Sequence, residues 1–127
     1  MAPYLFTKSI FEGKTITRYG DGSTARDYTY VSDIVAGILA ALDKDLKFEI
    51  INLGNSCPIK LNEFISIVEK HVGRAANIVE KPIPPGDVMI TYADISKAKA
   101  LLGYQPKVSF DERIKRLVEW YQGEIDG

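Results

Sequence analysis

The sequence predicts an α/β fold whose parallel sheet is incomplete. Helical and strand patterns alternate along the 127 residues, which is typical of α/β proteins. Only three strand candidates are visible, and residues 48–53 form an apolar run typical of a strand buried inside a larger sheet. The composition, 46% hydrophobic and 26% charged, is that of an ordinary globular domain. We therefore expect a single domain or fragment over residues 1–127, missing most of its parallel sheet.

The first part of the chain is expected to form two helices around one strand. Residues 3–12 have a proline suited to a first helical turn, and Gly13 can end that helix. Residues 15–19 are rich in β-branched and aromatic side chains, which indicates a strand. A turn over residues 20–23 follows. Apolar residues at helical spacing then predict an amphipathic helix over residues 32–43.

The middle of the chain continues the alternation. Residues 48–53 are expected to form the buried strand, which Gly54 closes. Apolar side chains at helical spacing predict a helix over residues 61–72. Residues 77–80 are expected to form a short strand. The prolines of residues 82–86 exclude a helix there and predict a rigid loop.

The last part of the chain is expected to hold two helices. Asp94 can cap a helix that runs to Leu102 and is ended by Gly103. Ser109 and Glu112 have the spacing of a capping box. A final amphipathic helix is therefore expected to begin after Ser109.

Charge and apolar patterning argue against several partners. A net charge of −1 offers no attraction to nucleic acid or to an anionic membrane. No run of about 18 apolar residues could span a bilayer, and the first residues lack the pattern of a signal peptide. The chain has one cysteine, Cys57, which excludes an intrachain disulfide and a multi-cysteine metal site. We expect Cys57 to serve only as a small side chain near a turn. We expect no nucleic-acid or membrane partner and a reducing, cytoplasmic setting.

Two charged residues could contact a ligand. Arg26 follows a Gly/Ser/Thr loop and could bind a phosphate in a bidentate manner; the alternative is a salt bridge to Asp27 or to another surface acid. Asp87 follows Gly86, where the backbone can approach a ligand closely. Its carboxylate could accept hydrogen bonds from two ribose hydroxyls; the alternative is an ordinary loop acid. Spacing alone favours the structural alternative for both residues.

Other candidates have structural explanations that outweigh functional ones. Asp33 lies at the start of a helix, where a carboxylate interacts favourably with the helix dipole. Tyr28 and Tyr30 share one face of an extended segment and are expected in the core. His71 has no partner motif and is expected at the surface. The aromatic residues 120–121 are expected to pack in the interior.

The order of short motifs resembles the C-terminal half of the extended short-chain dehydrogenase/reductases, the NAD-dependent epimerase/dehydratase family. The resemblance covers nearly the whole chain, through Gly13-Lys14-Thr15-Ile16, Tyr19-Gly20-Asp21-Gly22, Arg26-Asp27-Tyr28, Tyr30-Val31-x-Asp33, Asn52-Leu53-Gly54, Pro85-Gly86-Asp87, Ala93-Asp94, Lys97-Ala98 and Leu102-Gly103-Tyr104-x-Pro106. Within the family, segments 26–30, 61–65, 69–73 and 119–121 are most similar to UDP-glucuronate 4-epimerases. The implied fold is the C-terminal substrate-binding portion of an extended Rossmann-type epimerase.

The resemblance implies a UDP-sugar site. The strand from Ile16 to Tyr19 would hold the uracil, largely through backbone groups. Arg26 would bind the diphosphate, and Asp87 would bind the ribose hydroxyls. Many relatives have a second phosphate-binding arginine two residues before the glycine of Gly-Asp, where this chain has Pro84. Glucuronate epimerases tend to lack that arginine as well.

The resemblance also implies that NAD carries the reaction, removing a hydride from C4 of the sugar and returning it to the other face. The family holds NAD on a glycine-rich loop and uses a Tyr-x-x-x-Lys pair. We assign neither to this chain; Tyr28 and Tyr30 lack a lysine four residues later. We expect a UDP-sugar as substrate, NAD in a full-length parent, and no cofactor and no catalytic residue in this chain. Residues 28–33 would pack against the NAD-binding domain.

Three functions stay open. The first is the substrate-binding part of a UDP-sugar 4-epimerase that converts UDP-glucuronate to UDP-galacturonate. The second is a fragment of another nucleotide-sugar dehydratase or decarboxylase, and the third is a stand-alone nucleotide-sugar-binding module. The apolar strand at residues 48–53 would leave an unpaired edge, which invites pairing with another chain. We therefore expect a homo-oligomer in which this strand, or the helix over residues 32–43, meets its counterpart.

Overall fold

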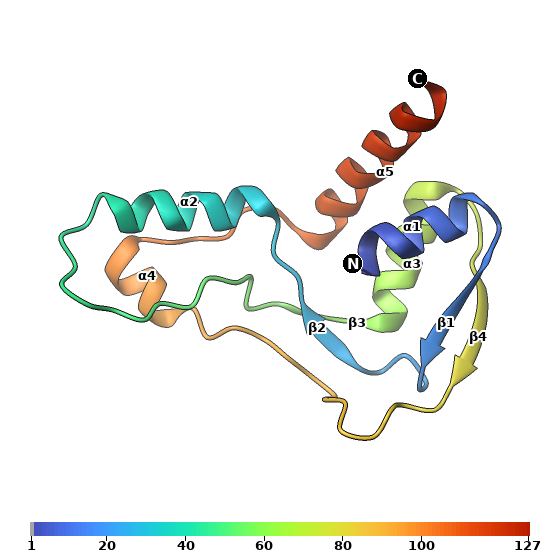
Figure 1. The fold of residues 1–127 in the computed structure, drawn as a ribbon, viewed down its shortest axis with the longest axis horizontal. Helices are drawn as coiled ribbons and strands as arrows, with labels where there is room; N and C mark the ends of the chain where they lie inside the picture. Colours follow the sequence, from blue (N-terminus) through green and yellow to red (C-terminus); the bar gives the residue numbers. More distant parts are fainter. Residues whose placement is uncertain (1) are drawn as a thin grey trace.

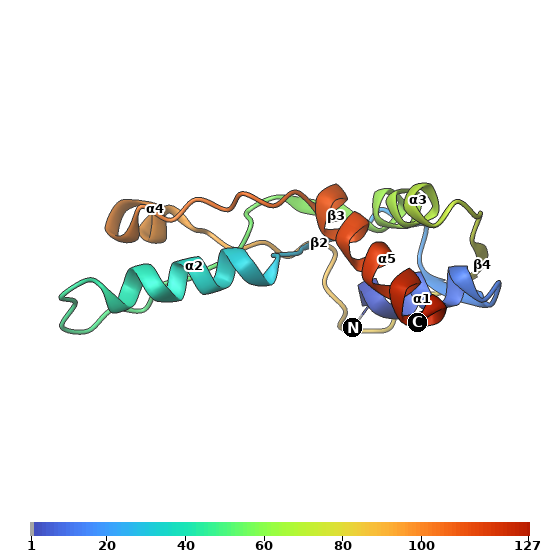
Figure 2. The same ribbon diagram turned by 90° about the horizontal axis from the view of Figure 1, so that it is seen from above.

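The chain has two regions joined by a two-stranded ribbon (Figure 1). A computed structural model describes residues 2–127, which form five helices and four short strands. Three helices and a parallel pair of strands gather in one region. Two helices and a long unpaired segment form the other, which extends to one side of the first in both views (Figures 1 and 2). The α/β class predicted from the sequence is confirmed.

The first region, here called the packed region, consists of α1 (Ala2–Phe11), β1 (Thr15–Tyr19), α3 (Leu61–Val72), β4 (Asn77–Lys81) and α5 (Phe110–Asp126). β1 and β4 run parallel, with the first residues of the two strands beside each other and the last residues likewise. This pair is the whole of the parallel sheet among residues 2–127. The expectation that most of the sheet is missing is therefore confirmed.

The packed region encloses the larger core. Ile10 of α1, Phe64 of α3 and Ile114 of α5 are almost completely buried. The ring of Phe64 lies 5.2 Å from that of Phe6 and 5.0 Å from that of Phe110, centroid to centroid. Burying side chains of this size stabilises a fold by about 1.5–3 kcal/mol each. The three helices therefore hold β1 and β4 in place.

A ribbon of β2 (Ala25–Asp27) and β3 (Pro58–Lys60), paired antiparallel, lies between the two regions. The loop after β4 runs beside β2: the Ala25 N–H donates to the Met89 carbonyl at 2.8 Å, and the Thr91 N–H donates to the Ala25 carbonyl at 3.1 Å. The sequence analysis predicted neither strand. Each is only three residues long and is held by distant segments, so no local pattern marks it.

The second region, here called the open region, consists of α2 (Val31–Leu42), residues 43–54 and α4 (Ser96–Leu102). Its core is small, with four buried apolar side chains: Ile95, Ala98, Leu102 and Tyr104. The packed region has eight in its cluster. Among residues 2–127 no helix is both long enough and apolar enough to cross a membrane.

The predicted buried strand over residues 48–53 is wrong. The segment has no regular secondary structure, and Phe48 and Ile50 are 81% and 73% exposed. In the described part of the chain, no backbone–backbone hydrogen bond involves residues 45–53. A strand needs a neighbouring strand to satisfy its N–H and C=O groups, and none lies beside this segment. Residues 45–53 are called the unpaired segment below.

The other predicted helices and strands are confirmed to within two residues. β1 and α3 have the predicted bounds, and Gly73 and Gly103 end α3 and α4 in the left-handed conformation. Ser109 caps α5, where its hydroxyl accepts a hydrogen bond from the Glu112 N–H at 3.1 Å.

The predicted cap of α4 needs a correction. Ile95, not Asp94, occupies the cap position. The Asp94 carboxylate instead accepts hydrogen bonds from the N–H of Ser96 at 3.0 Å and from its hydroxyl at 2.6 Å. The aspartate therefore closes a turn at the start of the helix.

Candidate functional site

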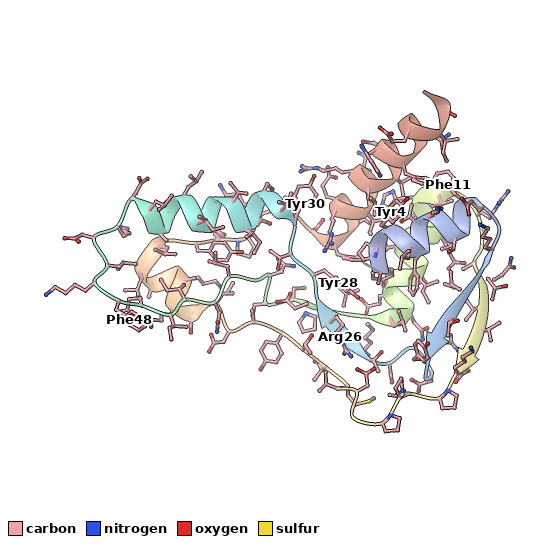
Figure 3. All side chains as sticks on the ribbon, in the orientation of Figure 1. Tyr4, Phe11, Arg26, Tyr28, Tyr30 and Phe48 are labelled. Carbon is pink, nitrogen blue, oxygen red and sulfur yellow. The ribbon has the colours of Figure 1, made fainter. Side chains whose placement is uncertain are left out.

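A cleft of about 320 Å³ opens between α1, β1, the ribbon and the loop after β4. The lining includes Phe6, Thr17, Tyr19, Arg26, Tyr28 and Asp87. Arg26 and Tyr28 lie near the middle of the molecule, where the two regions meet (Figure 3). Three of the four residues predicted to contact a substrate, Tyr19, Arg26 and Asp87, therefore line one cleft.

Arg26 and Asp87 are held against each other. Nη2 of Arg26 lies 3.2 Å from Oδ1 of Asp87 and donates to the Val88 carbonyl at 2.7 Å. Nη1 donates to the Ala25 carbonyl at 2.8 Å. Both side chains are partly exposed. The salt bridge that the sequence analysis raised as an alternative is thus present, with Asp87 as the partner of Arg26 instead of Asp27.

The remaining candidates lie on β1, whose side chains alternate between two environments. Thr17 and Tyr19 line the cleft. Ile16 is 3% exposed and belongs to the core of the packed region, so its side chain does not reach the cleft. β1 pairs with β4 on one edge only among the described residues, so its other edge carries backbone groups without a strand partner.

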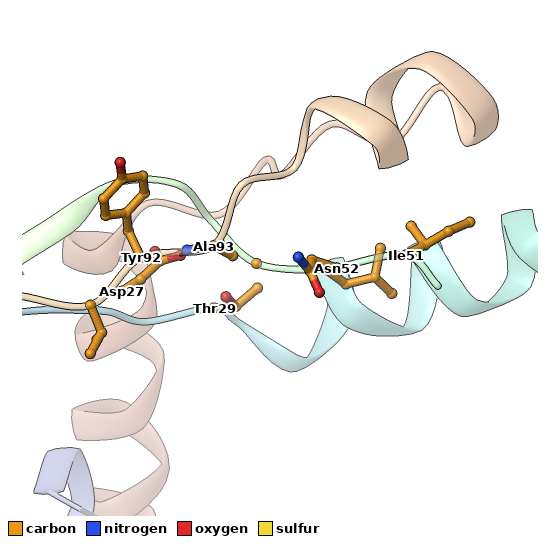
Figure 4. Close-up of a pocket in the computed structure, with 9 residues that line it drawn as sticks. Asp27, Thr29, Ile51, Asn52, Tyr92 and Ala93 are labelled. Carbon is orange, nitrogen blue, oxygen red and sulfur yellow. Dashed lines mark hydrogen bonds between the residues drawn. The ribbon is translucent and has the colours of Figure 1, made fainter. Parts of the chain in front are cut away.

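Asp27 is the site residue whose role the sequence analysis missed. Its Oδ2 accepts hydrogen bonds from the backbone N–H groups of Asn55 at 3.2 Å, Ser56 at 2.9 Å and Ala93 at 3.1 Å, and its Oδ1 accepts one from Cys57 at 3.3 Å. Figure 4 shows Asp27 beside Ala93. One carboxylate therefore joins three chain segments next to Arg26. The sequence shows the adjacent arginine and aspartate, but backbone donors leave no sequence signal.

The two tyrosines that follow β2, Tyr28 and Tyr30, pack mainly against arginine side chains and aromatic rings. Tyr28 lies 5.3 Å from both Phe64 and Phe110, with the guanidinium of Arg113 5.5 Å from its ring centroid. Burial raises the pKa of the Tyr28 hydroxyl. Tyr30 lies under the guanidinium of Arg116, 5.0 Å away. Tyr28 is thus packed against the core as predicted, while it also lines the cleft.

Asp33 and His71 have partners that the sequence analysis did not foresee. Asp33 is 5% exposed and accepts hydrogen bonds from the N–H groups of Lys107 at 3.0 Å and Val108 at 3.1 Å. It fastens the segment before α5 to α2, a role beyond interaction with the helix dipole. His71 is partly buried, with Nε2 3.0 Å from Oδ1 of Asp111, so the surface prediction is wrong.

Tyr121 and Trp120, which were both predicted to pack in the interior, differ in burial. Tyr121 is buried, as expected, and its ring lies 5.1 Å from that of Phe11. Trp120 is 54% exposed, with its ring 6.4 Å from that of Tyr4. Trp120 therefore packs only partly. Cys57 is exposed, near the turn where it was expected.

Two short patterns, which the sequence analysis did not consider, have the spacing of the family's catalytic pair and of its dinucleotide loop. The structure around each pattern differs from what those motifs need. Tyr4 and Lys8 are four residues apart, but the Tyr4 ring packs 6.1 Å from that of Tyr121 and does not line the cleft. Gly20 and Gly22 follow β1 with the spacing of a dinucleotide loop. The chain there continues into β2, not into a helix whose N-terminus could hold a pyrophosphate. Neither pattern lies in the setting that the family's catalytic pair or dinucleotide loop requires.

Known proteins share this fold and sequence. Residues 4–117 match the family described as GDP-mannose 4,6 dehydratase. The UDP-glucuronate 4-epimerase of Thermodesulfobacterium geofontis is 44% identical over 127 residues, which are 99% of this chain and 39% of that protein.

Two solved structures are similar to 98% of this chain and to 40% of their own chains. One is the UDP-glucuronic acid 4-epimerase from Bacillus cereus in complex with UDP-glucuronic acid and NAD, with 34% identity and a TM-score of 0.89. The other is the UDP-glucose 4-epimerase from Thermotoga maritima with UDP-glucose, with 33% identity and a TM-score of 0.90. This chain thus spans about 40% of the length of these relatives. It belongs to the GDP-mannose 4,6 dehydratase family, as a C-terminal part of an extended short-chain dehydrogenase/reductase.

Proposed function

We propose that this chain is the UDP-sugar-binding part of an NAD-dependent UDP-sugar 4-epimerase that converts UDP-glucuronate to UDP-galacturonate. The observation that carries the proposal is the cleft in which Tyr19, Arg26 and Asp87 come together. The relatives named UDP-glucuronate 4-epimerases support this substrate, since they match nearly all of the chain. The structures in complex with UDP-sugars support the substrate class.

Arg26 is the residue proposed to bind the diphosphate. A guanidinium carries five N–H donors, and a phosphate can accept two of them side by side. The ion pair between Arg26 and Asp87 is partly exposed, and such pairs contribute about 0–1 kcal/mol. An incoming phosphate can therefore open it at little cost. Asp87 is then free to accept hydrogen bonds from the ribose hydroxyls.

β1 is the proposed uracil site. Its edge away from β4 offers N–H and C=O groups, which match the donor and acceptors of a pyrimidine ring. Tyr19 can cover the ring from the cleft wall. Ile16 takes part through its backbone only, since its side chain fills the core.

The setting of the glycines after β1 supports an NAD site outside this chain. The glycines after β1 lead into a strand, and no helix N-terminus follows them. We propose that residues 1–127 form one substrate-binding domain and that an NAD-binding domain, with the catalytic tyrosine and lysine, lies in the rest of a longer chain. On its own this chain would bind no NAD and would not catalyse the reaction. The single, exposed Cys57 is compatible with a cytoplasmic setting, which we keep in the proposal.

The two alternatives differ in what supports them. A dehydratase or decarboxylase would use the same UDP-sugar cleft, but the relatives reported above are named as epimerases. A stand-alone binding module should bury its apolar side chains, whereas the open region leaves many of them exposed. Both observations favour the epimerase part.

The test fuses residues 1–127 to the part of the Thermodesulfobacterium geofontis enzyme that this chain does not match. The fused protein should convert UDP-glucuronate to UDP-galacturonate, while the 127-residue chain alone should form no product and retain no NAD. Co-purification of NAD with the 127-residue chain would refute the assignment of NAD binding to a separate domain. A fused protein that converts UDP-glucose but not UDP-glucuronate would refute the substrate.

A further inference from the structure

The turn over residues 20–24 joins the two strands that carry the proposed nucleotide site. Tyr19 lines the cleft at the end of β1, and Arg26 lines it on β2. A single ribose connects the uracil of UDP to its diphosphate, so one UDP molecule can use both strands only if their spacing suits it. The turn is the direct link between the two strands and helps to set that spacing.

Asn62, the second residue of α3, holds this turn. Its side-chain Nδ2 donates to the Asp21 carbonyl at 2.9 Å, and its Oδ1 accepts a hydrogen bond from Nη1 of Arg18 at 3.2 Å. Its backbone N–H donates to the Gly22 carbonyl at 3.0 Å. The Asn62 side chain is not part of the cleft lining. One residue of α3 therefore ties β1 to the turn from outside the cleft.

An asparagine side chain matches both of its neighbours. The arginine offers only donors and the backbone carbonyl only accepts, while the amide supplies an acceptor for the first and a donor for the second. An aspartate at this position would place an oxygen against the Asp21 carbonyl, and an alanine would satisfy neither group. Both side-chain hydrogen bonds are exposed, and a hydrogen bond that competes with water adds little to stability. Their main effect is therefore on the geometry of the turn.

The turn has little freedom beside Asn62. Gly22 has a φ of +86°, and a Cβ atom added to it would overlap the Asn62 side chain. Arg18 is fixed as well, since its Nε donates to the Gly20 carbonyl at 3.3 Å and its Nη2 lies 3.1 Å from the Glu80 carboxylate on β4. The packed sheet thus fixes the first half of the turn, and α3 fixes its middle.

The end of the turn is part of the cleft wall. The N–H of Leu61, the residue before Asn62, donates to the Thr24 carbonyl at 2.8 Å, and both residues line the cleft. The next residue, Ala25, pairs with Lys60 in the ribbon, and Arg26 follows it. A displacement of the turn at Asn62 would therefore reach Arg26 within a few residues.

We infer that Asn62 is a positioning residue of the nucleotide site, which sets the spacing between the uracil-binding edge of β1 and the guanidinium of Arg26 through the turn over residues 20–24. The inference rests on the proposed function. It has a specific consequence: Asn62 matters for a ligand that carries both a uracil and a diphosphate. Uridine, which has no phosphate, needs β1 alone and is insensitive to Asn62.

The experiment is calorimetric titration of UDP and of uridine into the fused protein described above. Asn62→Ala should weaken UDP binding on the order of tenfold, because the contact of Arg26 with phosphate is misplaced and not removed, and should change uridine binding by less than about twofold. In an Arg26→Ala background, Asn62→Ala should cause no further loss of UDP affinity, since both residues act through one contact.

Asn77→Ala is the matched control. The Asn77 side chain also donates to a backbone carbonyl of a distant segment, that of Gly13 at 3.1 Å, but it lies beside the first residue of β1, at the end away from the turn. This variant should bind UDP as the wild type does.

Three results would overturn the inference while wild-type UDP binding is intact. They are unchanged UDP affinity in Asn62→Ala, equal losses for UDP and uridine, and an equal loss in the Arg26→Ala background. If Asn62→Ala does not fold, Asn62→Asp takes its place, because it keeps the acceptor for Arg18 and loses only the donor to the Asp21 carbonyl. A wild-type fused protein that binds no UDP would refute the proposed function, and the inference with it.

Discussion

The packed and open regions both contain many apolar residues but differ in how far they bury them. In the packed region, Phe64, Ile114 and Val68 are almost completely buried among three helices. In the open region, Leu42 is 76% exposed, and only a small cluster under α4 is buried. The difference teaches that apolar content predicts burial only where the covering elements are present. One region encloses a core between its helices, and the other has an uncovered apolar face.

The candidate site lies where these regions meet. Asp27 accepts hydrogen bonds from Asn55, Ser56 and Cys57, which follow the unpaired segment, and from Ala93, which precedes α4. The neighbouring Arg26 faces the cleft on the side of the packed region. Asp27 therefore ties the ends of two segments of the open region to the strand that carries the proposed phosphate ligand.

The largest contrast is expected from matched truncations in the two regions. Phe64→Ala should lower the free energy of unfolding by about 3–5 kcal/mol, because it leaves a cavity in a closed core. Leu42→Ala in the isolated chain should change it by no more than about 0.5 kcal/mol, because the side chain is already in water. Urea denaturation of both variants measures the contrast. Similar losses would show that the two regions are equally packed.

Asp27 is expected to have the next largest effect. Asp27→Ala leaves four backbone N–H groups without their acceptor and should destabilise the fold by about 2–3 kcal/mol. Asp27→Asn keeps one acceptor oxygen and should lose less. Thermal unfolding of both variants tests this order. An Asp27→Ala protein as stable as the wild type would contradict the proposed joining role.

The exposed face should also make the isolated chain associate with itself. Light scattering should show a species above the monomer mass, since two copies can cover each other's apolar stripe on α2, which includes the exposed side chains of Val35, Ile38 and Leu42. Ile38→Glu should shift the population toward monomer by placing a charge on that stripe. Ile125→Glu, outside it, should not. A wild-type chain that stays monomeric at high concentration would contradict this expectation.

A small pH effect is expected within the packed region. The hydrogen bond from Lys70 lowers the pKa of Asp111, with a further contribution from His71. A carboxyl whose pKa is lowered on folding stabilises the fold above its unfolded value, near 3.9, and this contribution is lost as the pH falls through the folded value. Acid titration should therefore show that the wild type is more stable than Asp111→Asn at pH 6 and that the difference shrinks as the pH falls below about 4. A constant difference across that range would contradict the ion pair as its cause.

Local patterns in the sequence predicted the elements that are long enough to carry a clear local signal. Periodicity and a terminal glycine were enough for α3, and β-branched residues were enough for β1. They were not enough for β2 and β3, which have only three residues each. The side chains of residues 48–53 suit a sheet, which is why a strand was predicted there, but among residues 2–127 no strand lies beside this segment.

The site was predictable as a set of residues but not as an arrangement. The resemblance pointed to Tyr19, Arg26 and Asp87, and these residues do line one cleft. The ion pair between Arg26 and Asp87 depends on the loop after β4 running beside β2, which sequence spacing does not show. Asp27 escaped prediction because its partners are backbone groups.

Calorimetric titration of UDP into the fused protein tests the proposed cleft most directly. Arg26→Ala should weaken UDP binding by about 2–3 kcal/mol, because a charge-assisted, bidentate contact to phosphate is lost. Arg26→Lys should restore only part of the affinity, since an ammonium group cannot bind in a bidentate manner. Lys14→Ala, which removes a cation paired with Glu12 outside the cleft lining, serves as the control and should bind UDP as the wild type does. Equal UDP affinity of the wild type and Arg26→Ala would contradict the account and leave Arg26 as a structural partner of Asp87.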